Sequence, residues 1–237
     1  MENMMGFASI ILAAGKGSRM KSDLPKVMHN IGGAPMIDHV LKSADEAGAA
    51  RNIVVVGYGG ELVAAHVKGR AETVEQTDLN GTGGAALCAR EALAGFDGDA
   101  IVLYGDGPFV RPETMQAVLA KRAEGYDVVA VGFTPDDPTG YGRMVSNGDD
   151  LEGIVEHKDC DAAQLKINLC NLGVIAAKAG VLFDLLAQVG NNNANGEYYL
   201  TDVIALARAA GKRCGVVECD ADEATSVNSR AQLAQAE

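Results

Sequence analysis

The sequence has little of what marks several common protein classes. Its 237 residues include no Trp, 6 Pro and 5 Cys, and 20 Lys and Arg are outnumbered by 32 Asp and Glu. The formal charge of −12 argues against a nucleic-acid or anionic-membrane surface as the main partner. With 48% hydrophobic and 22% charged residues, the composition is that of a globular chain rather than a disordered or fibrous one.

Membrane spans and cysteine-based sites are also missing. No apolar run reaches the roughly 18 residues that a membrane span needs. The apolar stretch from Ala8 to Ala14 lacks a basic leader and runs into Gly-Lys-Gly, so it predicts a buried strand rather than a signal peptide. The cysteines have no CxxC spacing, which argues against a disulfide framework or a zinc site. We therefore expect reduced structural thiols and a cytoplasmic protein.

Short β-branched apolar runs alternate with helix-like segments along the chain. This alternation predicts an α/β fold with a mostly parallel sheet and helices on both faces. An apolar stripe from Met36 to Ala44 predicts a helix that ends near Gly48, and Asp202 to Ala210 repeats the pattern. The expected strands are Ile10 to Leu12, Ile53 to Val56, Ile101 to Tyr104, Val128 to Gly132, Val174 to Ala176 and Gly215 to Val217.

The helical period is lost between about Gly142 and Asn171. Around the turn Asn147-Gly148 we expect the extended segments Arg143 to Ser146, Leu151 to Glu156 and Lys166 to Leu169. We interpret this region as a small extended substrate-binding insertion. No repeat or linker marks a second domain, so residues 1–237 are expected to form a single domain.

A buried strand opens into a Gly-rich basic turn between Ile10 and Met20. Backbone N–H groups in such a turn can hold phosphate oxygens. The spacing excludes a Walker A loop, and Met20 stands where a dinucleotide fingerprint needs Gly or Ala. Any one basic side chain here could belong to a solvated loop, but four of them with a single acid, Asp23, favour a polyphosphate site. The four are Lys16, Arg19, Lys21 and Lys26.

A second strand, Ile101 to Tyr104, delivers Asp106 into a Gly/Pro turn. Open α/β sheets bind ligands at the carboxyl ends of their strands, and a carboxylate there suits Mg²⁺ attached to phosphates. Asp106 could equally cap the helix expected after Pro112. The residues alone leave both interpretations open.

The run from Leu12 to Met20, with Pro25-Lys26-Val27, resembles the signature of sugar-1-phosphate nucleotidyltransferases. Further segments are similar to the uridylyltransferase domain of bacterial bifunctional N-acetylglucosamine-1-phosphate uridylyltransferase/glucosamine-1-phosphate acetyltransferases. These segments are Asp137 to Arg143, Gly153 to Asp159, Asn191 to Asp202 and Val227 to Arg230. The resemblance covers nearly the whole chain and implies a Rossmann-like fold of the nucleotide-diphospho-sugar transferase type.

The resemblance also implies roles for individual residues. The nucleotide would be contacted by Leu12, Ala13, Ala14, Gly15 and Lys26, with Gln76, Gly81 and Thr82 selecting uracil. The sugar side would comprise Tyr104, Gly105, Gly142, Glu156, Asn171 and Asn228, with Tyr199 and Thr201 lining an acetyl pocket. Arg19 and Lys26 would hold the phosphates of the nucleotide. Arg19, Lys26 and Asp106 would be catalytic, and Asp106 with Asn228 would hold Mg²⁺.

The implied reaction joins UTP and N-acetylglucosamine 1-phosphate to give UDP-N-acetylglucosamine and pyrophosphate, for peptidoglycan and lipopolysaccharide precursor synthesis. A phosphate monoester is already largely ionised at neutral pH, so no general base is needed. Two alternatives stay open: a nucleotidyltransferase for another sugar 1-phosphate, and a non-catalytic UDP-sugar-binding module, which would not need Asp106 and Asn228. An NAD-dependent dehydrogenase is disfavoured by Met20.

The chain departs from the family pattern near the expected base site and pocket. Leu79, Asn80 and Gly84 stand where the family often has Gln, Leu and His, and Gly107, Phe109 and Leu172 stand where Val, Leu and Thr are usual. The family continues past the position of Asn228 into a β-helix of hexapeptide repeats. We therefore expect no acetyl transfer and a monomer for this chain, with a trimer where the β-helix is present.

Overall fold

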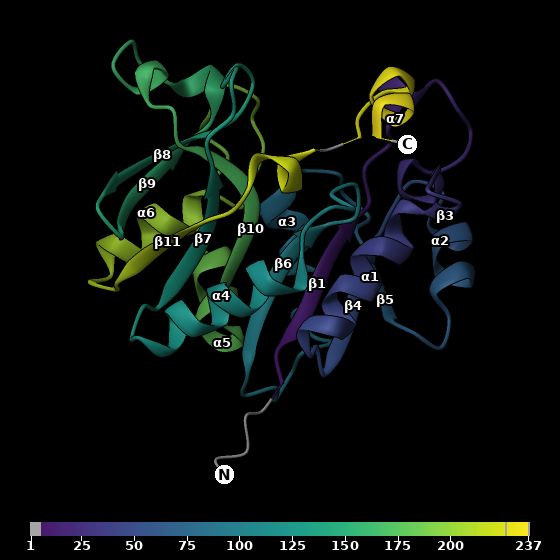
Figure 1. Ribbon diagram of the computed structural model, residues 1–237. Helices are drawn as coiled ribbons and strands as arrows, with labels where there is room; N and C mark the ends of the chain where they lie inside the picture. The colour runs from purple at the N-terminus through teal and green to yellow at the C-terminus, as the bar shows by residue number, and fades with distance from the viewer. Residues whose placement is uncertain (1–5, 226, 237) are drawn as a thin grey trace.

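The computed structural model describes residues 6–225 and 227–236. Within them, a nine-stranded sheet runs in the order β5-β4-β1-β6-β10-β7-β11-β9-β8 (Figure 1). In that order the strands are β5 (Glu72–Glu75), β4 (Arg51–Val56), β1 (Ala8–Ala13), β6 (Asp99–Tyr104), β10 (Cys170–Lys178), β7 (Val128–Phe133), β11 (Cys214–Glu218), β9 (Asp150–Val155) and β8 (Arg143–Asn147). A separate ribbon pairs β2 (Asn30–Ile31) with β3 (Ala34–Pro35).

Only β10 and β9 run against the other strands of the large sheet, so the mostly parallel α/β sheet is confirmed. The strand β1 lies parallel between β4 and β6, and its Ile10 is level with Ile53 and Val102. All six residues of β1 are buried. The carboxyl ends of β1 and β6 therefore meet at the same edge of the sheet.

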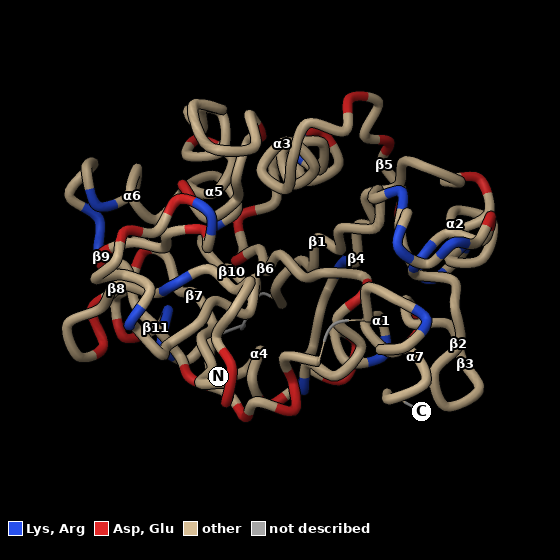
Figure 2. The backbone as a smooth tube through the Cα atoms, turned by 90° about the horizontal axis from the view of Figure 1, so that it is seen from above, with Lys and Arg blue, Asp and Glu red and all other residues tan. Residues whose placement is uncertain are grey.

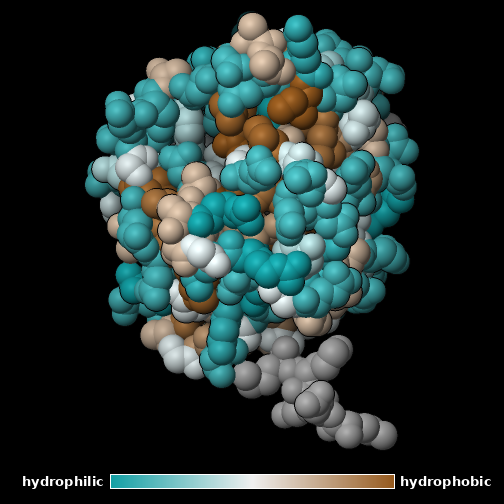
Figure 3. All heavy atoms as spheres, turned by 90° about the vertical axis from the view of Figure 1, so that its left-hand side faces the viewer, coloured by the Kyte–Doolittle hydropathy of each residue, from teal (hydrophilic) through white to brown (hydrophobic). Residues whose placement is uncertain are grey.

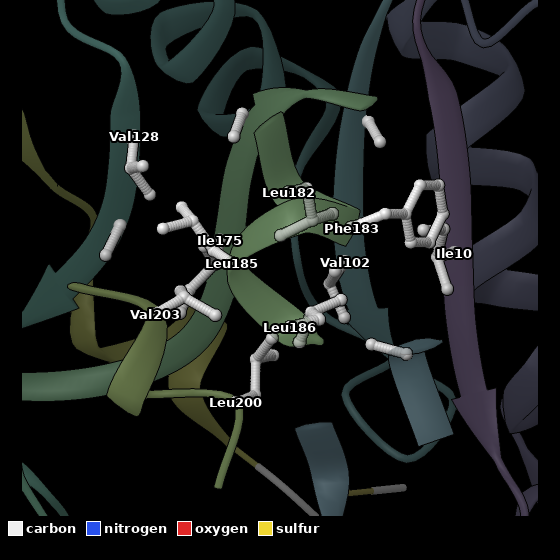
Figure 4. Close-up of a cluster of buried hydrophobic side chains, with 14 of the residues drawn as sticks. Ile10, Val102, Val128, Ile175, Leu182, Phe183, Leu185, Leu186, Leu200 and Val203 are labelled. Carbon is white, nitrogen blue, oxygen red and sulfur yellow. The ribbon is translucent and has the colours of Figure 1, made fainter. Parts of the chain in front are cut away.

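Helices cover both faces of the sheet, as the sequence predicts. Alternate residues of β1 divide between two cores, with Ile10 in one and Ile11 in the other. Figure 4 shows the first core, where Phe183 of α5 lies beside Ile10. The first core includes α3 (Thr82–Leu87), α5 (Ala179–Leu186) and α6 (Asp202–Ala209), and the second includes α1 (Met36–Ala47), α2 (Gly60–Val67) and α4 (Pro112–Ala123).

The expected insertion forms the antiparallel hairpin β8–β9, with Asn147 paired to Asp150 across its turn. Hydrophilic residues cover most of this side of the molecule, and hydrophobic ones show mainly in a hollow near its upper end (Figure 3). The prediction of an extended Lys166 to Leu169 was wrong at its start. The carboxylate of Asp161 accepts the backbone N–H groups of Ala163 and Gln164, both at 2.8 Å, and so initiates a turn instead of a strand.

Short 3₁₀ helices lie in the loops at the carboxyl edge of the sheet. They are η1 (Ser18–Met20), η2 (Lys26–Met28), η3 (His157–Asp159), η4 (Gln164–Lys166) and η5 (Ala221–Ala224). The last helix, α7 (Arg230–Ala236), lies at this edge beside the first loop of the chain (Figure 1). Val227 and Leu233 pack there with Met20, Ile31 and Met36, so the C-terminal segment is fixed against the Gly-rich loop.

No helix among the described residues is long and apolar enough to cross a membrane. The five cysteines are free thiols, and burial raises the pKa of Cys214 to about 11 and that of Cys219 to about 12. These two side chains therefore stay protonated at neutral pH and behave as packing groups.

Candidate functional site

Two adjoining cavities open where β1 and β6 end. The β1 cavity has a volume of about 360 Å³, and the β10 cavity has a volume of about 350 Å³. Tyr104, Asp106 and Asn228 line both of them. Two ligands bound in these cavities would therefore meet at the same small group of side chains.

The β1 cavity gathers residues from the Gly-rich loop and from the start of α3. It is lined by Leu12, Ala13, Ala14, Gly15, Lys26, Val27, Gln76, Leu79, Gly81, Thr82 and Ala85 in addition to the shared residues. Every residue that the resemblance assigned to the nucleotide is in this set except Arg19, which lines the β10 cavity. Most of the lining is small side chains and backbone, which suits a flat base and phosphate oxygens.

The β10 cavity is lined by residues from more distant segments. Besides the shared residues they are Arg19, Gly107, Val110, Phe133, Gly140, Tyr141, Gly142, Glu156, Asn171, Leu172, Gly173, Val174, Glu223 and Ala224. Of the residues that the sequence assigned to the sugar, Tyr104, Gly142, Glu156, Asn171 and Asn228 are in this lining.

A charged cluster lies where the cavities meet. The ammonium of Lys26 forms an ion pair with Asp106 and donates to Asn228 Oδ1 at 3.0 Å. Arg19 Nη2 donates to the same Asn228 oxygen at 2.9 Å. The interpretation of Asp106 as a helix cap was wrong, because the residue before α4 is Arg111. Asp106 instead lines both cavities.

The oxygen atoms of this cluster fit a hard divalent cation. Asp106 Oδ2 and Asn228 Oδ1 both contact one positively charged atom, Lys26 Nζ, so the two oxygens converge on a single point. Mg²⁺ takes oxygen ligands and completes its shell with water and phosphate, so one carboxylate and one amide suffice. Zinc is a poorer match, because no three His, Cys, Asp or Glu side chains of the described residues are arranged so that they could hold one metal ion together.

The end of the β1 cavity is held by hydrogen bonds between distant loops. Tyr198 donates its N–H to the Asn80 carbonyl at 2.8 Å, and Gly83 donates to the Tyr198 carbonyl at 2.8 Å. Thr82 Oγ1 accepts the N–H of Leu200 at 3.0 Å. These bonds fix the segment that carries Gly81 and Thr82.

In the β10 cavity, Glu156 Oε1 accepts a hydrogen bond from the Thr201 hydroxyl at 3.0 Å. Burial raises the pKa of Glu156, and nearby Asp159, Asp202 and Glu197 act in the same direction against the Thr201 bond. The carboxyl group is thus a half-buried acceptor in the lining of the cavity.

Asn171 and Gly173 shape the wall beside Tyr104. Asn171 Oδ1 accepts the N–H of Gly173 at 3.0 Å, which directs the Asn171 side chain along this wall. Gly173 has a φ of +96°, and a Cβ there would lie 2.4 Å from the Tyr104 ring. Burial raises the pKa of Tyr104, so its hydroxyl stays protonated.

Several predicted residues lie behind the lining rather than on it. Thr201 and Tyr199 are buried and absent from the lining, and the Thr201 hydroxyl donates to Glu156, which is part of it. Gly105 packs against Val27 and the Leu12 carbonyl under the floor.

Lys16 is exposed and absent from both linings, as is Lys21. Figure 2 looks down on this edge and shows basic positions grouped on the α2 side.

Sequence reasoning missed part of the β10 lining. The rings of Phe133 and Tyr141 meet edge to face with centroids 4.9 Å apart. Phe133 ends β7 at the carboxyl edge, which is the signal that could have identified it. Glu223 had no sequence signal. It is buried and accepts hydrogen bonds from the Arg111 N–H and the Thr114 hydroxyl, so it supports the wall.

Residues 9–157 match the family described as the MobA-like NTP transferase domain. The chain is 51% identical over 97% of its length to the bifunctional protein GlmU of Rhodospirillum rubrum and 50% identical over 96% to that of Cereibacter sphaeroides. It spans about half the length of these curated relatives, 52% and 51%. The fold matches a crystal structure of UDP-glucose pyrophosphorylase complexed with UDP-glucose with a TM-score of 0.75 at 20% identity, covering 98% of this chain and 97% of that one.

Proposed function

Since this chain belongs to the MobA-like NTP transferase domain family, we propose that it transfers UMP from UTP to N-acetylglucosamine 1-phosphate in the cytoplasm. The products are UDP-N-acetylglucosamine, a precursor for the cell envelope, and pyrophosphate. The identity of about 50% to GlmU proteins supports this choice of substrates. The observation that carries the proposal is the pair of cavities that share Asp106 and Asn228.

In the proposed reaction, an oxygen of the sugar phosphate attacks the α-phosphorus of UTP. A new P–O bond forms as the bond between the α-phosphorus and the bridging oxygen breaks, and pyrophosphate leaves with that electron pair. The nucleophile is ionised near pH 7, because the second pKa of a phosphate monoester is about 6. The protein therefore has to bring two anions together rather than remove a proton.

The charged cluster provides cationic groups that can bring the two anions together. Lys26 lies at the junction of the cavities, where charge would accumulate on the transferred phosphoryl group. Arg19 lies on the β10 side and holds Asn228 in place. Mg²⁺, held by Asp106 and Asn228, would supply further neutralisation of the phosphate oxygens.

Each cavity would bind one half of the product. The small side chains and backbone of the β1 cavity suit the nucleotide, and the polar groups of the β10 cavity suit a sugar. Glu156 can accept from a sugar hydroxyl, and Asn171 offers an amide to the same space. Such groups penalise a substrate that leaves them unpaired.

Pyrophosphate release across four nucleoside triphosphates and several sugar 1-phosphates tests the proposal. We expect the highest kcat/KM for UTP with N-acetylglucosamine 1-phosphate, and none without a divalent cation. A higher value for glucose 1-phosphate would indicate a nucleotidyltransferase for another sugar. Tight UDP-sugar binding without turnover for any pair would indicate a binding module.

A further inference from the structure

The side-chain amide of Gln76 is held by two acceptors at the wall of the β1 cavity. Its Nε2 donates to the Gly81 carbonyl at 3.2 Å and to Asn80 Oδ1 at 3.2 Å. Gln76 is only 6% exposed, yet it contributes to the cavity lining. Both N–H bonds of the amide are therefore directed at the protein, and the atom left to face a ligand is Oε1.

The Gly81 carbonyl fixes which way the amide points. A carbonyl can only accept, so turning the Gln76 amide over would place two oxygen atoms against each other. Asn80 strengthens this preference, because it presents its own Oδ1 to the same NH₂ group. Asn80 is itself placed by its backbone, whose N–H donates to the Asp78 carbonyl and whose carbonyl accepts from Tyr198.

Gly84 provides the space that the Asn80 side chain occupies. A Cβ added at Gly84 would lie 2.0 Å from Asn80 Oδ1 and 2.9 Å from its Cγ. Any larger residue at position 84 would force the Asn80 amide away from Gln76. These are two of the positions where the chain departs from the family pattern, and the structure shows that the two departures depend on each other.

The direction of the Gln76 amide matters for base choice. Uracil carries an N3–H donor, whereas cytosine has an acceptor at N3. An amide that offers only Oε1 pairs with the uracil donor and repels the cytosine acceptor, while a reversed amide would do the opposite.

We propose that Asn80, accommodated by Gly84, is a positioning residue that locks the Gln76 amide and thereby makes the β1 cavity select uracil over cytosine. The proposal rests on the proposed function, because it assigns the β1 cavity to the base of the nucleotide. It adds two residues that act through Gln76 rather than on the base itself. Thymine shares the N3–H donor of uracil. The fixed Gln76 amide therefore discriminates against CTP but does not distinguish UTP from dTTP.

The test compares kcat/KM for UTP and CTP in Asn80→Ala, Gly84→Ala and Asn80→Asp. In the first two variants, we expect the UTP to CTP ratio to fall about five- to tenfold, the effect of one lost neutral hydrogen bond. The double variant Asn80→Ala/Gly84→Ala should fall no further, because both changes remove the same contact. The carboxylate that Asn80→Asp introduces can still accept from Nε2, so this variant should keep the parent ratio even where its added charge lowers both values.

Leu79→Ala is the matched control. Leu79 lines the same cavity from the adjacent position and is 44% exposed, and its loss should lower both kcat/KM values together. A thermal melt of each variant checks folding. Gly84→Ala displaces only the end of a flexible side chain, so it gives a second result if Asn80→Ala does not fold.

Two results would refute the positioning role of Asn80. One is a parent-like UTP to CTP ratio in both Asn80→Ala and Gly84→Ala. The other is a UTP to CTP ratio that falls as far in Asn80→Asp as in Asn80→Ala. A parent protein that does not prefer UTP would instead refute the base assignment of the proposed function. In that case the ligand-free proteins still decide on the lock by NMR. The Gln76 side-chain N–H signals should exchange slowly with solvent in the parent and in Asn80→Asp and faster in Asn80→Ala, and equal exchange in all three would refute it.

Discussion

The two cavities are lined by different kinds of protein groups. The β1 cavity is formed mainly by short side chains and backbone from the β1 loop and the start of α3. The β10 cavity takes side chains from β6, β7, β10, η5 and the loop after β9, including the half-buried acid Glu156 and the buried acid Glu223. Backbone suits a phosphate chain of any nucleotide, whereas buried polar side chains suit one particular sugar. Point substitutions should therefore alter substrate choice more readily in the β10 cavity.

Substitutions in the charged cluster between the cavities should not discriminate between nucleotide and sugar. Asp106 lines both cavities and pairs with Lys26, so Asp106→Asn should affect nucleotide and sugar equally. A neutral amide is a poor substitute for the anionic ligand of Mg²⁺, and we expect kcat to fall on the order of 10²–10³-fold for every substrate pair. Pyrophosphate release over a Mg²⁺ titration measures this loss.

Asp23→Asn is the control, because Asp23 is an exposed acid on the basic loop and outside both linings. It should leave kcat within about twofold, as surface substitutions usually do. A folded Asp106→Asn protein with parent-like kcat at saturating Mg²⁺ would remove Asp106 from the proposed metal site.

The sequence predicted the parallel part of the fold best, because each strand and helix there is a local pattern. The runs at Ile10, Ile53 and Ile101 pair as parallel neighbours, with helices on both faces. The reversed direction of β10 was not predicted. A buried strand has the same apolar run in either direction, and only its pairing with β6 and β7 sets the polarity.

The sequence also predicted one part of the candidate site better than the other. Apart from Arg19, the residues assigned to the nucleotide all line one cavity, since they lie in short motifs of the sequence. On the sugar side Thr201 lies one hydrogen bond behind the lining, and Phe133 and Glu223 were not anticipated. Those contacts depend on how β7, β9 and η5 are brought together, which a motif in one segment does not encode. The contact between Asn80 and position 84 likewise depends on the folded structure.

A second prediction concerns the basic loop. Arg19 lines the β10 cavity and donates to Asn228, whereas Lys16 is exposed and lines neither cavity. Arg19→Ala should lower kcat/KM by about 10- to 100-fold, through a lost cation and a less fixed Asn228, and it should raise the Mg²⁺ concentration needed for half-maximal rate. Lys16→Ala should cost less than about threefold. Equal losses in the two variants would mean that the loop acts only through its total charge.

A third prediction should separate the cavities. Asn171→Asp keeps an acceptor for the Gly173 N–H but removes the amide donor from the β10 cavity. We expect kcat/KM to fall about tenfold for N-acetylglucosamine 1-phosphate and less for glucose 1-phosphate, with KM for UTP unchanged. A change in KM for UTP of the same size would show that the two cavities are not independent.

The smallest expected effect concerns the stability contribution of Glu156. Burial raises the pKa of this carboxyl group above its ordinary value of 4.5, with neighbouring acids acting in the same direction. Below pH 4.5 the group is protonated in both the folded and the unfolded chain, so its contribution to stability is then fully present. As pH rises through the raised pKa, the unfolded chain has already released the proton that the folded chain still holds, and the free energy of unfolding falls.

Glu156→Gln removes this loss while its amide oxygen can still accept from Thr201. The variant should therefore match the parent near pH 4.5 and melt progressively higher than the parent as pH rises, by about 2–4 °C for each kcal/mol recovered, before the difference levels off. Glu152→Gln on the exposed side of β9 should follow the parent at every pH. Thermal melts from pH 4.5 to 8 measure both variants. A gap between Glu156→Gln and the parent that narrows with rising pH would show that the cavity stabilises the charged form of Glu156, and the β10 cavity would then favour cationic groups over sugar hydroxyls.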